Sequence, residues 1–269
     1  MKNITILGSR VDNITRSEAL KYIRQFIVSK KPHQICTLNP EYLMAALEDE
    51  ELGYIINNSA LNTPDGGGLI FASKFLGSPL KEKITGVELS KSIFSLSEKY
   101  GWKIFLLGGR DNVAQKTADI IKKKYPKIKI VGIHEGNPIL KPISKRVFES
   151  GYKTRRSIDF KLSKMLPKSN IQILQKIIAA KPHILLVAYG CPKQDKFIAR
   201  FSQYLRVPVM IGVGGTFDYL SGTIRYAPEW MRKFHLEWLY RLLQNPQKRL
   251  NRIFTAVIRF PWAVITYKK

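Results

Sequence analysis

Over most of the chain, short runs of apolar residues alternate with segments in which apolar residues recur at helical spacing. Short apolar runs predict strands at 34–38, 103–107, 129–133, 184–188 and 207–213. Between them, apolar residues recur at helical spacing and predict amphipathic helices at 17–28, 41–57, 90–100, 113–124 and 171–180. Strands that alternate with helices in this way are typical of an α/β domain. We therefore expect a mainly parallel, Rossmann-like sheet with helices on both faces.

The residues that follow these strands are rich in turn formers and polar groups. The sequences are Thr-Leu-Asn-Pro at 37–40, Gly-Gly-Arg-Asp at 108–111, Tyr-Gly-Cys-Pro at 189–192 and Gly-Val-Gly-Gly at 212–215. Ligands of open α/β sheets bind beyond the carboxyl ends of the strands. The pattern thus predicts a functional site at this edge.

Two segments depart from the α/β rhythm. Residues 138–170 carry nine Lys and Arg against two acids, which indicates a basic, partly mobile insertion or simply a solvated loop. Residues 225–269 carry ten Lys and Arg against two acids, interleaved with aromatic residues at helical spacing. Such interleaving is typical of a helix lying at a membrane interface. We expect a core at 1–224 and a helical appendage at 225–269.

The hydrophobic content, the net charge and the cysteines limit which classes of protein and which partners are compatible with the sequence. The chain has 269 residues, 45% of them hydrophobic, so it can bury a core and is not disordered. A formal charge of +25 indicates a polyanionic partner: nucleic acid, acidic lipid or a phosphorylated substrate. Cys36 and Cys191 lack the spacing of a disulfide scaffold and are expected as free thiols of a cytoplasmic protein. The apolar runs are too short for a signal peptide or a membrane span.

The Thr-Pro-Asp-Gly-Gly-Gly segment at 63–68 is the first candidate site. It is compatible with an ordinary tight turn, but three glycines opening a helix cost about 1 kcal/mol each relative to alanine. Close backbone approach to a ligand would explain them. At such a turn Asp65 can act as a general base or bind a hydroxyl.

Two glycine-rich strand ends are candidates for phosphate or ribose. Gly212-Val213-Gly214-Gly215-Thr216-Phe217 departs from the dinucleotide fingerprint, because Phe217 occupies the third glycine position. Backbone N–H groups at Gly214, and at Gly108 and Gly109, can still face an anion.

The sequence predicts neither a metal site nor a cofactor. The four histidines are scattered, with no ligand spacing to either cysteine. Gln194 opens a helix after a strand and can bond a base or a sugar. In the tail, Arg249 and Arg252 are three residues apart on one helical face and, with Arg241, are suited to a diphosphate.

Taken together, the landmarks resemble those of the WecG/TagA/CpsF family of bacterial glycosyltransferases. They span residues 34–252 in family order: TLNP at 37–40, TPDG at 63–66, TGVEL at 85–89, LLGG at 106–109, GCPKQ at 190–194, GVGGTFD at 212–218 and LEWLYRL at 236–242. The chain departs from the family pattern at Lys83 and Tyr226, where arginine is usual, and at Asp195, where glutamate is usual.

The resemblance implies transfer of an N-acetylhexosamine, typically N-acetylmannosamine, from a UDP-sugar donor. The acceptor would be undecaprenyl-diphosphate-linked N-acetylglucosamine, in synthesis of teichoic acid or another cell-wall or surface polysaccharide. It implies that Asp65 is the general base.

Further roles follow from the same resemblance. Thr37, Asn39 and Gln194 would bind substrate near Asp65, and Asp218 would lie at the nucleotide pocket beside the glycine turns. The appendage would dock on the bilayer and bring arginines to the site.

From these roles we expect inversion by single displacement. Lys83, Arg241, Arg249 and Arg252 would hold the diphosphate without a metal. The protein would lie peripherally on the anionic inner face of the cell membrane, and whether it forms a homo-oligomer stays open. The alternative is a basic RNA-binding or RNA-modifying α/β protein, although no RRM, KH or helix-turn-helix signature is present. We expect no nucleic-acid partner.

Overall fold

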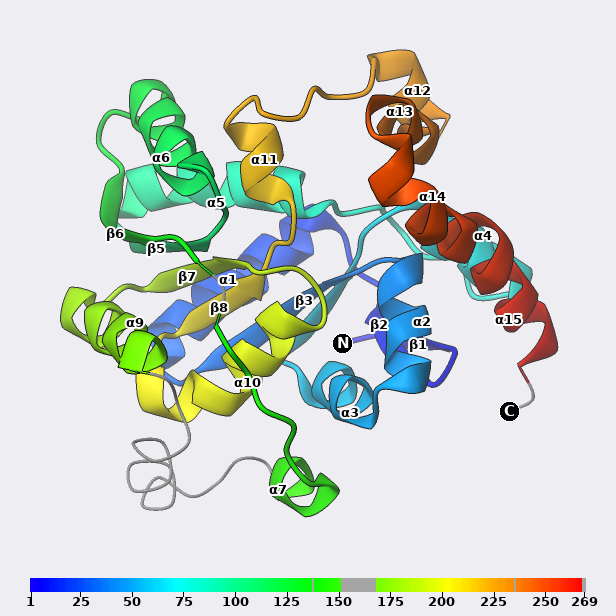
Figure 1. Cartoon of the computed structure of the whole chain (residues 1–269), viewed down its shortest axis with the longest axis horizontal. Helices are drawn as coiled ribbons and strands as arrows, with labels where there is room; N and C mark the ends of the chain where they lie inside the picture. The colour runs from blue at the N-terminus through cyan, green and yellow to red at the C-terminus, as the bar shows by residue number, and fades with distance from the viewer. Residues whose placement is uncertain (137, 151–167, 235, 268–269) are drawn as a thin grey trace.

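A parallel sheet forms the centre of the computed structural model, which describes residues 1–136, 138–150, 168–234 and 236–267 (Figure 1). In this part of the chain the sheet has six strands. Their order is β4 (Leu61–Pro64), β3 (His33–Leu38), β8 (Val209–Gly212), β7 (Ile184–Ala188), β5 (Lys103–Gly108) and β6 (Lys129–His134). All neighbouring pairs are parallel. The predicted α/β fold is confirmed.

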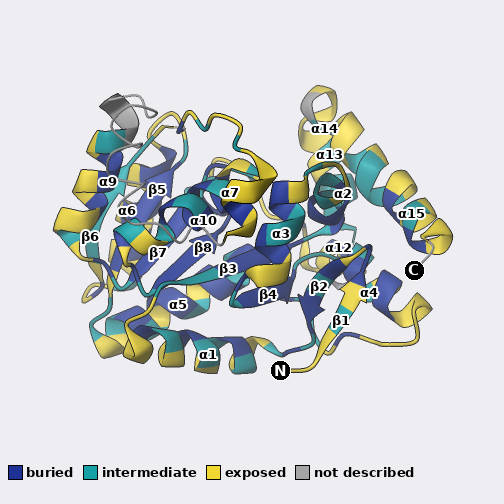
Figure 2. Ribbon diagram, turned by 90° about the horizontal axis from the view of Figure 1, so that it is seen from below, coloured by how far each residue is buried: buried dark blue, intermediate teal, exposed yellow. Residues whose placement is uncertain are grey.

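Helices cover both faces of the sheet because successive strand residues point to opposite sides. On β5, Ile104 and Leu106 pack into one apolar cluster, whereas Phe105 and Leu107 pack into another. The first cluster contains α1 (Arg16–Ser29), α5 (Gly86–Tyr100), α6 (Val113–Lys124) and α11 (Thr216–Leu220). The second contains α9 (Lys168–Ala180) and α10 (Lys193–Leu205). Figure 2 shows α1 and α5 on the opposite side of the strands from α9 and α10.

A third apolar cluster extends the molecule beyond the β4 edge of the sheet. It combines the antiparallel hairpin β1 (Asn3–Ile6) and β2 (Ser9–Asp12) with α2 (Pro40–Glu48), α3 (Glu50–Asn58) and α4 (Gly67–Phe75). The single helix predicted at 41–57 is therefore two helices. Asp49 separates them, and its side chain accepts a hydrogen bond from the Leu52 N–H at 3.1 Å as the cap of α3.

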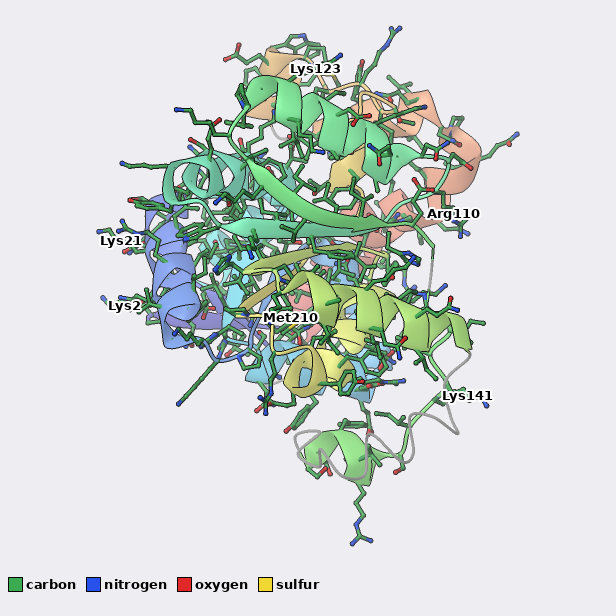
Figure 3. All side chains as sticks on the ribbon, turned by 90° about the vertical axis from the view of Figure 1, so that its left-hand side faces the viewer. Lys2, Lys21, Arg110, Lys123, Lys141 and Met210 are labelled. Atoms are coloured by element: carbon green, nitrogen blue, oxygen red, sulfur yellow. The ribbon has the colours of Figure 1, made fainter. Side chains whose placement is uncertain are left out.

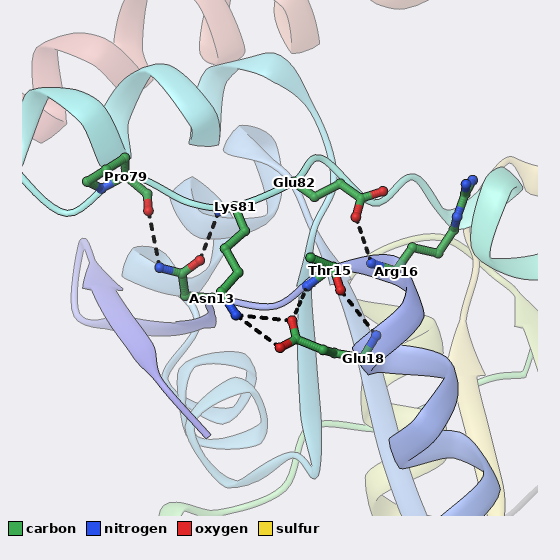
Figure 4. A network of polar contacts seen from close by, with 7 residues as sticks. All are labelled: Asn13, Thr15, Arg16, Glu18, Pro79, Lys81 and Glu82. Carbon is green, nitrogen blue, oxygen red and sulfur yellow. Dashed lines mark hydrogen bonds and ion pairs between the residues drawn. The ribbon is translucent and has the colours of Figure 1, made fainter.

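The loop between α4 and α5 is tied to the start of α1 by polar contacts (Figure 4). The side chain of Asn13 donates to the Pro79 carbonyl at 3.1 Å and accepts from the Lys81 N–H at 2.9 Å. Lys81 Nζ lies 3.0 Å from Glu18 Oε1, and the Arg16 N–H donates to the Glu82 side chain at 2.9 Å. The loop therefore has a defined path, and it delivers Lys83 to the site.

The C-terminal segment is helical, as its spacing predicts. It comprises α12 (Glu229–Lys233), α13 (Glu237–Gln244), α14 (Pro246–Phe254), the π-helix η1 (Thr255–Arg259) and α15 (Phe260–Thr266). Phe260 and Val264 of α15 are buried in the third cluster, against residues of α2 and α4. The tail thus packs on the α/β core, and its separation as a domain at residue 225 stays a prediction.

Part of the predicted basic insertion at 138–170 is visible. Residues 145–149 form the short helix α7 (Lys145–Glu149), whose Phe148 is buried and lies 5.6 Å from the ring of Tyr54 on α3. Residues 151–167 of the insertion lie outside the described residues.

Candidate active site

Asp65 lies directly beyond the carboxyl end of β4. Its backbone N–H donates to the Leu38 carbonyl at 2.6 Å, which continues the pairing of β3 and β4 by one residue. Its side-chain Oδ2 accepts a hydrogen bond from the Gly86 N–H at 3.0 Å. Gly86 opens α5, so the carboxylate lies at the positive end of a helix dipole.

The surroundings of Asp65 tune its acidity. Burial raises the pKa of the Asp65 carboxyl to about 6, against the lowering effects of the Gly86 N–H and the charges of Arg241 and Lys83. The nearby Glu237 carboxylate raises the pKa further. At pH 7 the group is therefore mostly ionised, with a basicity well above that of an exposed aspartate. Such a carboxylate suits general-base catalysis.

Two cations come to Asp65 from segments far apart in the sequence. Lys83 arrives on the loop before α5, and its Nζ lies 3.0 Å from Glu237 Oε2 of α13. Arg241, one turn along α13, places its guanidinium over the ring of Tyr219 at 4.8 Å from the centroid. The fold thus holds α13 beside the strand ends.

The three predicted tail arginines do not share one environment. Arg249 of α14 is half-buried, and burial together with the charge of Arg241 lowers its pKa. It acts electrostatically on Asp218, whose pKa is raised by burial. Arg252, by contrast, contacts Glu41 of α2 through both Nε and a terminal nitrogen, at 2.6 Å each. The structure therefore brings Arg241 and Arg249 together and engages Arg252 in an ion pair.

Thr37 and Asn39 have structural hydrogen bonds. The buried Thr37 hydroxyl donates to the Gly212 carbonyl at 2.9 Å and links the ends of β3 and β8. Asn39 caps α2, because its side-chain oxygen accepts from the Tyr42 N–H at 2.9 Å. Both residues lie at the predicted edge and fix the shape of the strand ends.

Gln194 links the helix α10 to the glycine turn after β8. Its Oε1 accepts from the Gly214 N–H at 2.9 Å, and its Nε2 lies 3.4 Å from the Tyr42 hydroxyl. The next residue, Asp195, is fully buried, and its carboxylate faces the Tyr42 hydroxyl and the Cys36 thiol. Burial raises the pKa of Asp195 to about 7.

The three glycines proposed for nucleotide contact differ in their surroundings. A Cβ on Gly108 would lie 2.7 Å from the Ala188 carbonyl oxygen, so this glycine permits close approach of β5 and β7. Gly109 has φ +84° and lies beside the start of α6. Gly214 has φ +52°, and a Cβ at this position would meet no atom of the described residues within 4 Å, so its turn faces open space. Of the three, Gly214 fits ligand approach best.

Sequence reasoning missed three residues that shape this site. Glu237 pairs with Lys83, Tyr219 stacks under Arg241, and Glu41 pairs with Arg252. The spacing of Glu237 and Arg241, four residues apart on a helix, was the only local signal for any of them. Tyr219 also contacts Tyr226, with ring centroids 5.1 Å apart.

Two further features concern metal ions and membranes. Within the residues that the structure describes, no group of three or more His, Cys, Asp or Glu side chains is arranged to hold a metal ion. None of the helices in the described ranges is both long enough and apolar enough to traverse a bilayer.

Comparison with known proteins gives a consistent result. The model of the family described as "Glycosyl transferase WecG/TagA/CpsF family" matches residues 4–269. An N-acetylglucosaminyldiphosphoundecaprenol N-acetyl-beta-D-mannosaminyltransferase of Bacillus subtilis is 29% identical over 247 residues, covering 91% of this chain and 85% of that protein. A protein of the same name from Staphylococcus aureus is 28% identical over 252 residues, covering 93% and 87%.

The fold, the acid at the strand end and these matches define an enzyme of the glycosyltransferase class. The chain belongs to the WecG/TagA/CpsF family. This membership confirms the resemblance seen in the motifs, and it favours the transferase over the RNA-binding alternative.

Proposed function

We propose that this enzyme transfers N-acetylmannosamine from a UDP donor to N-acetylglucosamine carried on undecaprenyl diphosphate. The relatives are named for transfer of N-acetylmannosamine to that lipid-linked acceptor. The product would enter a cell-wall or surface polysaccharide such as teichoic acid.

The observation that carries the proposal is the position of Asp65. Its carboxylate lies beyond a strand end, is held by the Gly86 N–H, and has a pKa raised by burial to about 6. Such a group can remove the proton from an acceptor hydroxyl as that oxygen attacks the anomeric carbon. The UDP–sugar bond breaks in the same step, so the proposal includes inversion at that carbon.

Cations near Asp65 support a nucleotide diphosphate as leaving group. Lys83, Arg241 and Arg249 lie close enough to the acids of the site to act on their pKa values. Their charges would offset the negative charge that develops on the departing UDP. Gly214, at an open turn, and Asp218 are proposed to contact the nucleotide, with Gly109 beside α6 and Gly108 supporting the strand ends.

The remaining site residues are proposed to position the acceptor. Thr37 and Asn39 hold the ends of β3 and α2, and Gln194 orients the turn at Gly214. Arg252 would reach the diphosphate of the lipid by leaving its exposed ion pair with Glu41, which such surface pairs permit at a cost of about 1 kcal/mol or less.

A lipid-linked acceptor and a UDP donor together favour residence on the inner face of the cell membrane. Lys and Arg near an anionic surface contribute about 1 kcal/mol each. The basic tail supports such peripheral attachment.

The proposal is tested by product analysis. The protein is incubated with a panel of UDP-N-acetylhexosamines and a short-chain polyprenyl-diphosphate N-acetylglucosamine. The mass of the product is measured by mass spectrometry, and its anomeric configuration is determined by NMR. We expect a β-linked disaccharide lipid, formed fastest from UDP-N-acetylmannosamine.

The substitution Asp65→Asn tests the general-base role, because asparagine has nearly the same size but cannot accept the proton. We expect turnover to fall by about 10²–10⁴-fold while UDP binding persists. Undiminished turnover, or a product with retained configuration, would contradict the proposed role of Asp65.

A further inference from the structure

The C-terminal helix is apolar on two opposite sides. Phe260 and Val264 face the protein and are buried. On the other side, Ile258, Trp262 and Ile265 are 54%, 68% and 61% exposed and recur at helical spacing. A helix that is apolar all round is normally covered by protein or lipid. The outer side of η1 and α15 therefore has the character of a contact surface.

Helix α4 of the α/β core has the same property. Leu69 and Ala72 are buried, whereas Phe71 and Phe75 are 60% and 65% exposed, and Leu76 follows at the helix end. Among the described residues, every aromatic side chain that is more than half exposed lies either on α4 or beyond Glu229. Helix α4 thus shares its surface chemistry with the tail rather than with the rest of the core.

The two exposed faces belong to one end of the molecule. Helices α4 and α15 contact each other, and Leu76, Val264 and Tyr267 line a common hollow of about 50 Å³. In Figures 1 and 2 both helices lie at the end opposite β6. We define the end face as Phe75, Leu76, Ile258, Trp262 and Ile265.

We propose that this end face, including α4, is the surface that contacts an anionic phospholipid bilayer. The inference rests on the proposed function, because it is the lipid-linked acceptor that brings the enzyme to a membrane. It extends membrane contact from the tail to a helix of the core.

Charge favours lipid over a second protein. Residues 66–81 contain two lysines and no acid, and residues 238–269 contain seven Lys and Arg and no acid, although Arg252 and Arg259 pair with Glu41 and Glu48 of α2. Figure 3 shows Lys21 of α1 and Lys123 of α6 at the edges of the molecule, so positive charge by itself does not mark the surface. The end face differs from these other basic regions because it has exposed aromatic side chains as well as positive charge. This combination is typical of segments that lie at a membrane interface.

Helix α4 also connects this surface to the catalytic centre. It begins at Gly67, two residues after Asp65, and ends at Phe75. At 1.5 Å per residue the axis of the helix from Gly67 to Phe75 is about 12 Å long. In the proposed acceptor, a diphosphate and one sugar separate the lipid chain from the reacting hydroxyl, and they would span a distance of this order. Because the loop after α4 is tied to α1 (Figure 4), the helix can act as a spacer of fixed length.

Vesicle sedimentation tests the proposal with the full chain. Phe75→Ser/Leu76→Ser is compared with Val28→Ser/Ile120→Ser, which removes two exposed apolar side chains from α1 and α6 instead. On vesicles of phosphatidylglycerol and phosphatidylcholine we expect the α4 variant to partition about tenfold more weakly than wild type, and the control within about twofold. Wild-type partitioning by the α4 variant would overturn the proposal. Circular dichroism establishes that each variant is folded.

Two further measurements separate the outcomes. With a short-chain soluble acceptor, the α4 variant should retain the wild-type rate, whereas its rate on undecaprenyl acceptor in vesicles should fall with its partitioning. If neither wild type nor any variant used the soluble acceptor, the proposed function would be wrong. The vesicle-binding experiment would still show whether the end face contacts the bilayer. If sedimentation velocity showed that the α4 variant dissociates a dimer while vesicle binding is unchanged, a second copy would be the occupant and the proposal would be wrong.

Discussion

At the scale of single residues, the Asp65 carboxylate is the proposed general base, and its ionised form also lowers the stability of the folded state. Its carboxyl is held by one backbone N–H, and burial raises its pKa to about 6, far from the value of about 4 expected in an unfolded chain. The folded state therefore favours the protonated form. Ionisation at higher pH, which a general base requires, opposes folding.

This coupling predicts a pH-dependent gain in stability for Asp65→Asn. Above pH 6 the wild type holds a buried charge that asparagine lacks, so we expect the variant to be more stable by about 2–3 kcal/mol at pH 8. The gain should shrink as pH falls through 6 and vanish below about pH 4, where the aspartate is protonated in both states. Urea unfolding at several pH values measures it.

Asp119→Asn on α6 is the control, because its carboxyl is exposed. Equal, pH-independent effects of the two substitutions would contradict a raised pKa at Asp65. The same pKa predicts that the wild-type rate falls as pH drops below about 6.

At the scale of elements, local signals predicted most of what was found. Apolar runs predicted strands at 34–38, 103–107, 129–133, 184–188 and 207–213, and the observed strands are 33–38, 103–108, 129–134, 184–188 and 209–212. The hairpin β1–β2 and the short strand β4 were not predicted, because polar residues interrupt their four positions, whereas the equally short β8 lies in a longer apolar run. The break at Asp49 was also missed, since the apolar spacing continues through it and only the cap marks it.

Helix α15 shows how an element can serve both the core and the surface. Phe260→Ala should lower the free energy of unfolding by about 3–5 kcal/mol, because the phenyl ring is fully buried against α2 and α4. Trp262→Ala, two residues along the same helix, should change it by about 0.5 kcal/mol or less, since Trp262 is 68% exposed. Denaturant unfolding followed by circular dichroism compares them. Similar losses for both would show that the exposed side is covered in solution.

At the scale of the whole molecule, the site is assembled from distant parts. Asp65 comes from a strand end, Lys83 from the anchored loop, and Arg241 and Arg249 from the tail. The large excess of positive charge, +25 overall, thus lies at the candidate site as well as on the surface. Because these cations lie near Asp65 and Asp218, we expect them to balance the charge of a diphosphate directly.

This assembly predicts that transfer continues when divalent metals are removed. We expect the rate in EDTA to stay within about twofold of the untreated enzyme, while Arg241→Ala and Arg249→Ala each raise the KM for the UDP-sugar. Steady-state kinetics with and without EDTA make the comparison. A rate lost in EDTA and restored by Mg²⁺ or Mn²⁺ would show that the cations of the chain do not suffice.

The sequence by itself determined the α/β class and the order of most elements, and it indicated polar and glycine-rich strand ends. These depend on short-range features: apolar spacing, helix caps and turn-forming residues that lie within a few positions of one another. It also indicated Asp65 and the basic tail, because glycine clusters and runs of charge are visible without a fold.

Only the tertiary structure decided which of these groups meet. It joined Lys83 to Glu237 and Arg241 to Tyr219, engaged Arg252 with Glu41, and exposed α4 beside α15. It also raised the pKa of Asp65 through burial. Contacts between residues from 22 to 211 positions apart, and the removal of water from a carboxyl, depend on packing of the whole chain, which no local pattern encodes.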